Sequence, residues 1–306
     1  MLEQMSHQKI EVTEDNVIFV NGFQRGGTNI LVNLIASHPD VGWVTETHQI
    51  FYGNKGSSSI DKWGKRMLYA PVVLATRQHI FWINKLDERK PLSKPFASYV
   101  DWRMKSSAKE KIKKNYANVN QTNGRDRAKV VPLFKNVNGV VLASELFSNI
   151  YPRSRFIGLV RDGLALCEGF IRRGWTAERF GKMYATVCNQ MIEDANRMPD
   201  YHIMRFEDIL VDPKTAIEEA YGWLGLDVLP GMKYRLQSKR SMDKNGQRSY
   251  LFGGNKDREV FWFSMEELKV RLRPDVNQNQ IAQLSEQDKE ICLNFVREPM
   301  EYFGYL

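Results

Sequence analysis

The chain has 306 residues, 42% of them hydrophobic and 26% charged, which fits one large folded domain and excludes wholesale disorder. Its net charge of +8 is uneven, because residues 103–129 hold nine Lys/Arg against two Asp/Glu, a net of +7. Such a basic segment attracts anions, including membranes and nucleic acid, or forms a solvated helix face. No run approaches the roughly 18–20 apolar residues that cross a bilayer, residues 1–14 lack a signal-peptide core, and three scattered cysteines predict neither a disulfide framework nor a zinc site. We expect a cytoplasmic protein, although a chain from which an anchor had been removed would look the same.

The chain begins with the pattern of a strand, a turn and a helix. Residues 16–21 (NVIFVN) form a short apolar run typical of a buried parallel strand, and residues 29–37 (NILVNLIAS) predict a helix that ends at His38-Pro39-Asp40. A second strand is predicted at 41–44. Residues 52–128 differ, being rich in aromatic and charged residues and interrupted by prolines. Within them the sequence predicts a helix inside 69–86, a basic helix or mobile segment at 106–115 and a loop at 118–127.

Strands and helices alternate again from residue 130. Strands are predicted at 130–134, 155–160 and 202–206, and helices at 141–150, 164–173, 180–197 and 213–224. This alternation implies a parallel sheet with right-handed crossovers. We therefore expect an α/β fold with a P-loop-like central parallel sheet flanked by helices, as a single domain over residues 1–306 with a mainly helical insertion at about 52–128.

Residues 22–29 (GFQRGGTN) form a glycine-rich turn between the first strand and helix, where backbone N–H groups and the helix dipole bind phosphate. Gly22 and Gly27 have the spacing of a nucleotide phosphate loop. Thr28 and Asn29, however, stand where triphosphate chemistry needs Lys and then Ser/Thr for Mg²⁺. Arg25 is the substitute cation inside the loop. The pattern favours a nucleotide whose single 5′-phosphate carries a transferable group; the alternative is a turn without a ligand.

This octapeptide, with the apolar helix and His38-Pro39-Asp40 after it, resembles the 5′-phosphosulfate loop of sulfotransferases that use 3′-phosphoadenosine 5′-phosphosulfate (PAPS). It most resembles the branch of the tyrosylprotein and heparan sulfate enzymes and their bacterial relatives. The resemblance covers about 17–51 and 130–258 and leaves 52–128 uncovered. It implies PAPS as co-substrate, no metal, and a set of donor-binding loop residues: Gly22, Gln24, Arg25, Gly26, Gly27, Thr28 and Asn29.

A second segment, residues 155–173, resembles the family's 3′-phosphate motif. Arg161 follows the predicted strand and matches the arginine that binds this phosphate. Gly169 stands where the family usually has a serine, and this is a departure. Arg173, which matches a second phosphate-binding arginine of the tyrosylprotein branch, or its neighbour Arg172 would offset the missing hydroxyl. The alternative is that these arginines are ordinary surface or ion-pair residues.

Two further segments resemble nucleotide-binding elements more weakly. In residues 204–210 (MRFEDIL), Phe206 replaces the family's tyrosine near the nucleotide, and Glu207 is expected to be structural. Near the C-terminus, three residues resemble a loop that closes over the nucleotide in bacterial members, or else belong to an ordinary connection: Gly254, Asn255 and Arg258.

The chemistry expected of such an enzyme needs a base and a cation. Sulfuryl transfer is an in-line displacement catalysed by positioning and electrostatic stabilisation, and the acceptor O–H must lose a proton. Glu46, after the second strand, matches the catalytic glutamate of the tyrosylprotein branch, and His48 is the alternative base. Arg25 and Lys135 are the candidate cations for the leaving phosphate, since Lys135 resembles the lysine after the family's central strand.

Two other functions stay open from the residues alone. A P-loop kinase-like phosphotransferase would need Mg²⁺ and the missing Lys-Ser/Thr pair. A non-enzymatic protein would use the basic segment to bind nucleic acid or an anionic glycan, but the segment has no recognised nucleic-acid motif, so we expect no nucleic-acid partner. The acceptor, a hydroxyl or an amine, is not identified. The positive charge favours an anionic acceptor, whereas Trp63, Trp82 and Trp102 would suit a carbohydrate; residues 52–128 are expected to contribute to its site.

Overall fold

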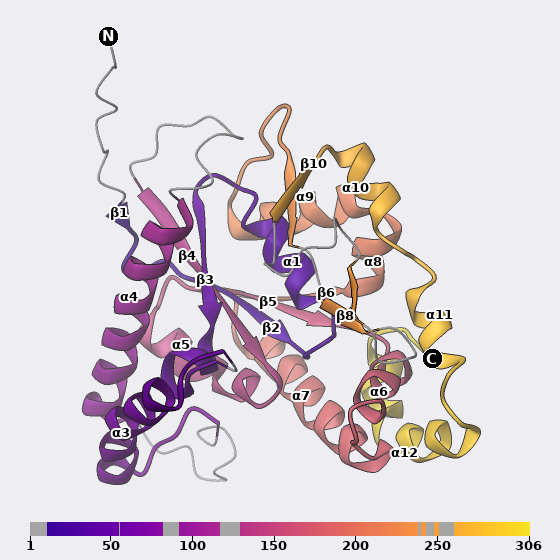
Figure 1. The fold of residues 1–306 in the computed structure, drawn as a ribbon, viewed down its shortest axis with the longest axis horizontal. Helices are drawn as coiled ribbons and strands as arrows, with labels where there is room; N and C mark the ends of the chain where they lie inside the picture. The colour runs from indigo at the N-terminus through magenta and orange to yellow at the C-terminus, as the bar shows by residue number, and fades with distance from the viewer. Residues whose placement is uncertain are drawn as a thin grey trace.

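The structure, a computed structural model, describes residues 11–54, 56–81, 92–116, 129–237, 240–242, 248–250 and 260–306. Its centre is a parallel sheet in the order β1-β4-β2-β5-β6, and β3 also pairs with β4 (Figure 1). The strands are β1 (Glu11–Val12), β2 (Ile18–Gly22), β3 (Val41–Glu46), β4 (Lys129–Val137), β5 (Arg155–Val160) and β6 (Tyr201–Arg205). Every pairing in this sheet is parallel, which confirms the predicted α/β fold.

Helices cover both faces of the sheet because successive strand residues point to opposite sides. Phe19 belongs to one core, whereas its neighbours Ile18 and Val20 belong to the other. Phe19 is stacked between Phe134 and Phe156, its partners on β4 and β5, with ring centroids 5.8 and 5.0 Å away. The first core takes its helical residues from α2 (Thr47–Tyr52), α3 (Ser59–Thr76), α4 (Lys94–Tyr116), α5 (Ser144–Ile150), α6 (Gly163–Ile171), α7 (Ala177–Arg197) and α12 (Glu286–Tyr302).

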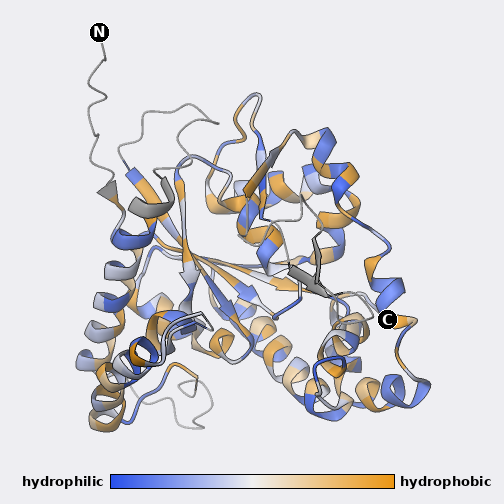
Figure 2. Ribbon diagram, in the orientation of Figure 1, coloured by the Kyte–Doolittle hydropathy of each residue, from blue (hydrophilic) through white to orange (hydrophobic). Residues whose placement is uncertain are grey.

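The second core lies under a different set of helices and a small two-stranded sheet. It includes residues of α1 (Thr28–Ile35), α8 (Phe206–Val211), α9 (Pro213–Leu224), α10 (Met265–Arg271), β7 (Tyr234–Gln237) and β10 (Val260–Phe263). Strands β7 and β10 pair antiparallel, as do β8 (Arg240–Met242) and β9 (Arg248–Tyr250). The remaining elements are a 3₁₀ turn η1 (Asn138–Ala143) and α11 (Val276–Ile281). The helices carry hydrophilic and hydrophobic residues together (Figure 2), as expected of helices with one face in water.

The described part of the predicted insertion contains two helices, α3 and α4, which pack against each other, and α4 also packs on β3 (Figure 1). Helix α3 begins ten residues before the predicted segment at residue 69 and contains Pro71, and the predicted basic segment 106–115 is the second half of α4. Several large apolar side chains of these helices are exposed, namely Ile60, Trp63, Met67, Leu68, Leu74 and Trp102. The loop expected at 118–127 lies outside the described residues.

Other boundaries differ from the sequence prediction in small ways. Strand β5 and helix α9 match it to the residue, whereas the helix expected at 141–150 is a 3₁₀ turn followed by α5. Phe206 begins α8 instead of ending a strand. The three cysteines Cys167, Cys188 and Cys292 are buried free thiols. Among the described residues, the structure contains no helix with the length and apolar character needed to cross a membrane.

Candidate functional site

The phosphate loop joins β2 to α1 at the carboxyl edge of the sheet. Arg25 and Gly27 adopt positive φ angles of 69° and 88°, and a Cβ on Gly27 would lie 2.1 Å from the Phe206 ring, so only glycine fits there. Gly27 is the N-cap residue of α1 and offers no side-chain cap, which leaves the first N–H groups of that helix for a ligand. The loop is held by Asn138, whose Oδ1 accepts from the Gln24 N–H at 3.1 Å.

Lys135 and Glu46 meet beside this loop because they are register partners on β4 and β3. The Lys135 Nζ lies 2.5 Å from Glu46 Oε1, and it also donates a hydrogen bond to Asn29 Oδ1. The Lys135 side chain is 3% exposed and that of Glu46 is 22% exposed. The buried ammonium of Lys135 therefore links the start of α1 to the carboxylate of Glu46, at the end of β3.

Glu46 has two further polar neighbours from α2. His48 Nδ1 lies 3.5 Å from Glu46 Oε2, and Gln49 Nε2 donates to the same oxygen at 3.3 Å. Burial raises the pKa of Glu46, but Lys135 above all, with His48 and Gln49, outweighs it and holds the pKa below its ordinary value. Burial lowers the pKa of His48, against the opposing effect of Glu46. At neutral pH the site thus presents a carboxylate and an uncharged imidazole, both able to accept a proton.

A row of buried polar side chains lies behind this corner. Thr47 Oγ1 donates to Asn136 Oδ1 at 2.5 Å, and Asn136 Nδ2 donates to Asn21 Oδ1 at 2.9 Å. The Asn21 amide then donates to Ser144 Oγ at 2.9 Å and to the Tyr201 hydroxyl at 3.0 Å. The row connects the carboxyl ends of β2 and β4 to the start of α2, immediately after β3.

Arg161 forms a second corner, just beyond β5. It is 5% exposed, and its Nη1 donates to the Arg25 carbonyl at 2.7 Å. Its Nε donates to Asn277 Oδ1 at 2.9 Å, and its Nη2 donates to Gln280 Oε1. The guanidinium also lies 4.9 Å above the centre of the Phe206 ring. The expected 3′-phosphate arginine is therefore tied to the phosphate loop on one side and to α11 on the other.

Glu207, which was expected to be structural, accepts hydrogen bonds from three donors at this corner. Its Oε1 accepts from the Asp162 N–H at 3.1 Å and from Asn277 Nδ2, and its Oε2 accepts from the Tyr305 hydroxyl at 2.6 Å. Burial lowers the pKa of Arg161, whereas Glu207 and Asp162 oppose that effect. The C-terminal part of the chain thereby fixes the arginine in place.

Of the other predicted nucleotide-binding residues, only some lie near Arg161. Gly169 is buried in α6 next to Gln280, whereas Arg173 is exposed beyond the end of α6, where burial of part of its side chain lowers its pKa. The Arg173 side chain forms no hydrogen bond or ion pair with another described residue, and burial is the only cause of its pKa shift. Arg172 pairs with Glu168 at 3.1 Å instead. Gly254, Asn255 and Arg258 lie outside the described residues.

The amides that complete both corners are not predicted by any motif in the sequence. Asn138, Gln49, Asn277 and Gln280 each bond a predicted site residue. None of them belongs to a motif. Gln49 lies three residues after Glu46, whereas packing between distant segments brings Asn138, Asn277 and Gln280 to the site. A signal for the last two existed in the polar run of residues 277–280 (NQNQ), but nothing in that run indicates its partner.

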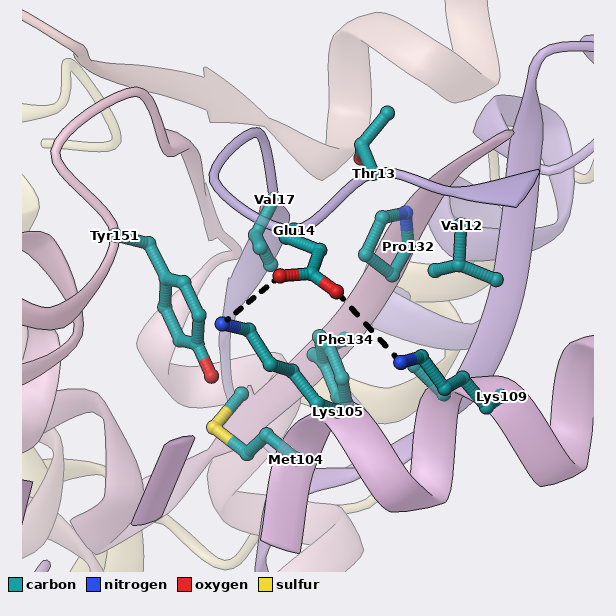
Figure 3. A pocket seen from close by; sticks show the side chains of 11 residues that line it. Val12, Thr13, Glu14, Val17, Met104, Lys105, Lys109, Pro132, Phe134 and Tyr151 are labelled. Atoms are coloured by element: carbon teal, nitrogen blue, oxygen red, sulfur yellow. Dashed lines mark ion pairs between the residues drawn. The ribbon is translucent and has the colours of Figure 1, made fainter. Parts of the chain in front are cut away.

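A small pocket elsewhere in the molecule is separate from this site. It lies where α4 covers β1 and β4, and Glu14 forms ion pairs of 3.6 Å with Lys105 and Lys109 at its mouth (Figure 3). None of the predicted site residues lines it. Among the described residues there is also no group of three or more His, Cys, Asp or Glu side chains placed to hold a metal ion.

Several solved sulfotransferase structures are similar to this chain. Among solved structures, a sulfotransferase domain from the curacin biosynthetic pathway is 14% identical, with 92% of this chain and 97% of that chain covered at a TM-score of 0.44. The sulfotransferase domain of the Synechococcus PCC 7002 olefin synthase is 15% identical, covering 96% and 98% at 0.43. Mouse sulfotransferase SULT7A1, in complex with PAP, is 12% identical, covering 95% and 85% at 0.42. At such scores these likenesses carry no argument about this chain's residues.

A search of curated proteins finds no match. The model of the sulfotransferase family, in contrast, matches residues 17–230, well over half of the chain. The matched stretch contains the phosphate loop, Glu46, Lys135 and Arg161. The chain therefore belongs to the sulfotransferase family, enzymes that transfer a sulfuryl group, which confirms the family and the reaction predicted from its motifs.

Proposed function

We propose that this enzyme transfers the sulfuryl group of PAPS to a hydroxyl or amine, with Glu46 as the base and Lys135 as the cation at the leaving oxygen. The observation that carries the proposal is the shared ammonium of Lys135. It contacts Asn29 at the phosphate loop, where the donor would end, and Glu46, where the acceptor would enter. The Lys135 side chain thus contacts both the proposed donor side and the proposed acceptor side of the site.

The donor would bind along the carboxyl edge of the sheet. Strand order reverses at β2, which lies between β4 and β5, and open parallel sheets bind ligands at such a point. The N–H groups at the start of α1 and the side chain of Arg25 would hold the 5′-phosphosulfate, together with Gly22, Gln24, Gly26, Gly27 and Thr28. Arg161 would hold the 3′-phosphate, a role supported by its bond to the Arg25 carbonyl. Gly169 and Phe206 would shape that subsite, and Arg173, exposed beyond the end of α6, would add a second positive charge.

The transfer step needs a proton acceptor and a charge at the leaving group. The acceptor oxygen forms a bond to sulfur while the bond from sulfur to the 5′-phosphate oxygen breaks, and the proton of the acceptor passes to Glu46. Lys135 lowers the pKa of Glu46 in the free enzyme, so the carboxylate is a weak base while the ion pair lasts. When Lys135 turns to the phosphate oxygen, it stabilises the developing charge and leaves Glu46 a stronger base. His48, uncharged beside Glu46, is the alternative base.

The acceptor would lie against the insertion of residues 52–128. Helix α2, which begins right after Glu46, packs on α3 and α4, so the insertion borders the proposed base. Trp63 and Trp102 are exposed there and would suit a sugar ring, while the basic residues of α4 would suit an anionic acceptor. Trp82, also expected there, lies outside the described residues. A cytoplasmic location belongs to the same proposal and is supported by the three free thiols.

Two measurements test this function. Calorimetry should show that 3′-phosphoadenosine 5′-phosphate (PAP) binds much more tightly than AMP, because only PAP can engage Arg161; equal affinities would contradict the donor assignment. Incubation with ³⁵S-labelled PAPS and a cell extract should then label an acceptor, which chromatography and mass spectrometry would identify. Glu46→Gln is the matched control, since it should bind PAP normally and label nothing.

A further inference from the structure

The space beside Gly169 is occupied by a side chain from another part of the chain. Gly169 is buried in α6, its φ is ordinary, and a Cβ added there would find Gln280 Nε2 as its nearest heavy atom at 3.8 Å. This is a normal contact distance, so no steric conflict requires a glycine. The amide of Gln280, from α11, takes up the space into which a side chain at position 169 would extend.

The Gln280 amide is also bonded to Arg161. Its Oε1 accepts from Arg161 Nη2, and its Nε2 donates to Glu168 Oε2 at 3.1 Å. An N–H donor is thus placed next to the guanidinium that we assign to the 3′-phosphate. Arginine and a neutral donor side by side are well suited to a phosphate group, which offers several acceptor oxygens.

The donor can be released from Glu168 at little cost. Glu168 is held by Arg172 on both oxygens, with Arg172 Nε 3.1 Å from Oε1 and Nη2 3.1 Å from Oε2. The carboxylate therefore keeps its ion pair when Gln280 turns away. Arg172 also offsets a negative charge that would otherwise repel a phosphate at this place. Asn277 has no such freedom, because its Nδ2 bonds to Glu207, which has no ion-pair partner in the described part of the chain.

We propose that Gln280 is a specificity residue for the nucleotide and donates its amide N–H to the 3′-phosphate beside Arg161. The amide supplies from α11 the donor that a hydroxyl at position 169 would supply from α6. The inference rests on the proposed function, since it assumes that the 3′-phosphate binds at Arg161. It adds that recognition of this phosphate depends on the C-terminal segment, beyond the stretch matched by the family model.

The test compares the affinities of PAP and AMP by calorimetry. In the wild type, a preference for PAP establishes the subsite, and its absence would contradict the proposed function and not this inference alone. Gln280→Ala should weaken PAP binding by roughly tenfold or more, the usual worth of a hydrogen bond to a charged group, and leave AMP binding unchanged. Gln278→Ala, an exposed neighbour on the same helix, is the matched control and should change neither.

A second substitution separates a direct contact from a supporting role. Adding Gly169→Ser to Gln280→Ala should restore most of the PAP affinity, because the hydroxyl then replaces the amide donor. If Gln280→Ala keeps the full preference for PAP, or loses PAP and AMP binding alike, the inference is wrong. A loss of PAP affinity that Gly169→Ser does not restore, in a variant with unchanged thermal stability, would assign Gln280 to holding Arg161 and would also overturn it.

Discussion

The two buried cations at the carboxyl edge of the sheet, Lys135 and Arg161, are bonded to different kinds of partner. Lys135 contacts a carboxylate, Glu46, at 2.5 Å. The three hydrogen bonds that the Arg161 side chain donates to described residues end on neutral oxygens, namely the Arg25 carbonyl and the amides of Asn277 and Gln280. An ion pair supplies a charge and a proton acceptor that can separate during a reaction, whereas a guanidinium bonded to neutral acceptors keeps its charge for an incoming anion. The first corner is therefore suited to transfer and the second to binding.

The side-chain types agree with this division. A lysine ammonium is a compact charge on a flexible stem and can move between Glu46 and a leaving oxygen, whereas an arginine offers a rigid fork that matches a phosphate. If the comparison is right, changes at the first corner should lower turnover and changes at the second should lower nucleotide affinity. In the variants, turnover is measured as PAP release with the extract fraction that supports labelling, and nucleotide affinity is measured by calorimetry.

The largest effect is expected from Glu46→Gln. Turnover should fall by about 10²–10⁴-fold, the usual worth of a general base, because the amide cannot take the acceptor proton. PAP affinity should change little, since Glu46 lies on the acceptor side of Lys135. His48→Gln is the control and should have a milder effect. Full activity in Glu46→Gln together with a collapse in His48→Gln would move the base to His48.

Lys135→Met should lower turnover by about 10²–10³-fold, the range for removing one donor from a developing negative charge. Methionine keeps the length of the side chain, so the packing of β4 should survive. The loss should appear in the rate at saturating PAPS and much less in PAP affinity measured by calorimetry. A variant that loses PAP affinity and keeps its rate would erase the distinction between the two corners.

Arg161→Lys should show the opposite pattern. The charge stays but the fork is lost, so PAP affinity should fall by roughly tenfold or more while AMP affinity is nearly unchanged. At saturating PAPS the rate should stay within a few fold of the wild type. Equal weakening of PAP and AMP would mean that Arg161 acts mainly by supporting the phosphate loop through the Arg25 carbonyl.

The pH dependence of kcat/KM sharpens the choice of base. A base works only when deprotonated, and the pKa of Glu46 in the free enzyme lies below its ordinary value of 4.5. The value of kcat/KM should therefore stay constant as the pH falls to about 4.5 and should decline only below that pH. The ion pair with Lys135 should likewise stabilise the fold above the ordinary pKa of Glu46 and cease to do so as the pH falls through the lowered one. If kcat/KM instead declines between pH 4.5 and pH 6.5, and the residual activity of Glu46→Gln declines over the same range, the base is His48.

The smallest effect is expected from removal of divalent metal. The phosphate loop has Thr28 and Asn29 where a Mg²⁺ nucleotide loop has Lys and Ser/Thr, and in the proposed mechanism Arg25 and Lys135 would supply the positive charge. Activity in excess chelator should equal activity without it. Strong inhibition that Mg²⁺ reverses would mean that charge at the first corner comes from a metal as well as from Lys135.

The sequence could predict the part of the site that follows from strand ends. Glu46 ends β3, Lys135 lies near the end of β4 and Arg161 follows β5; the carboxyl ends of parallel strands meet at one edge, so their proximity was foreseeable. The same logic located the phosphate loop before α1. The alternation of strands and helices was enough to predict the sheet, although Phe206 was placed at a strand end when it begins α8.

The rest depends on packing between distant segments, which local patterns do not encode. Asn277 and Gln280 reach Arg161 across more than one hundred residues of chain, and Asn138 reaches the phosphate loop in the same way. Elements after residue 225 were not predicted at all, although they hold Arg161 and Glu207 in place. In the insertion, prolines predict interruptions of the chain, yet Pro71 lies within α3. A proline in a helix removes a backbone donor, and the tertiary contacts of α3 outweigh that cost.

The buried row of Thr47, Asn136 and Asn21 also constrains how the chain folds. Asn21 and Asn136 are direct register partners on β2 and β4, and each is fully buried. A slip of β4 by one residue would turn Asn136 to the opposite face and leave an amide without its partner, at a cost of about 1–3 kcal/mol. These hydrogen bonds therefore fix the register of β2 against β4 and the position of α2 relative to both strands. The distances between the proposed catalytic residues are therefore set when the sheet assembles, before any substrate binds.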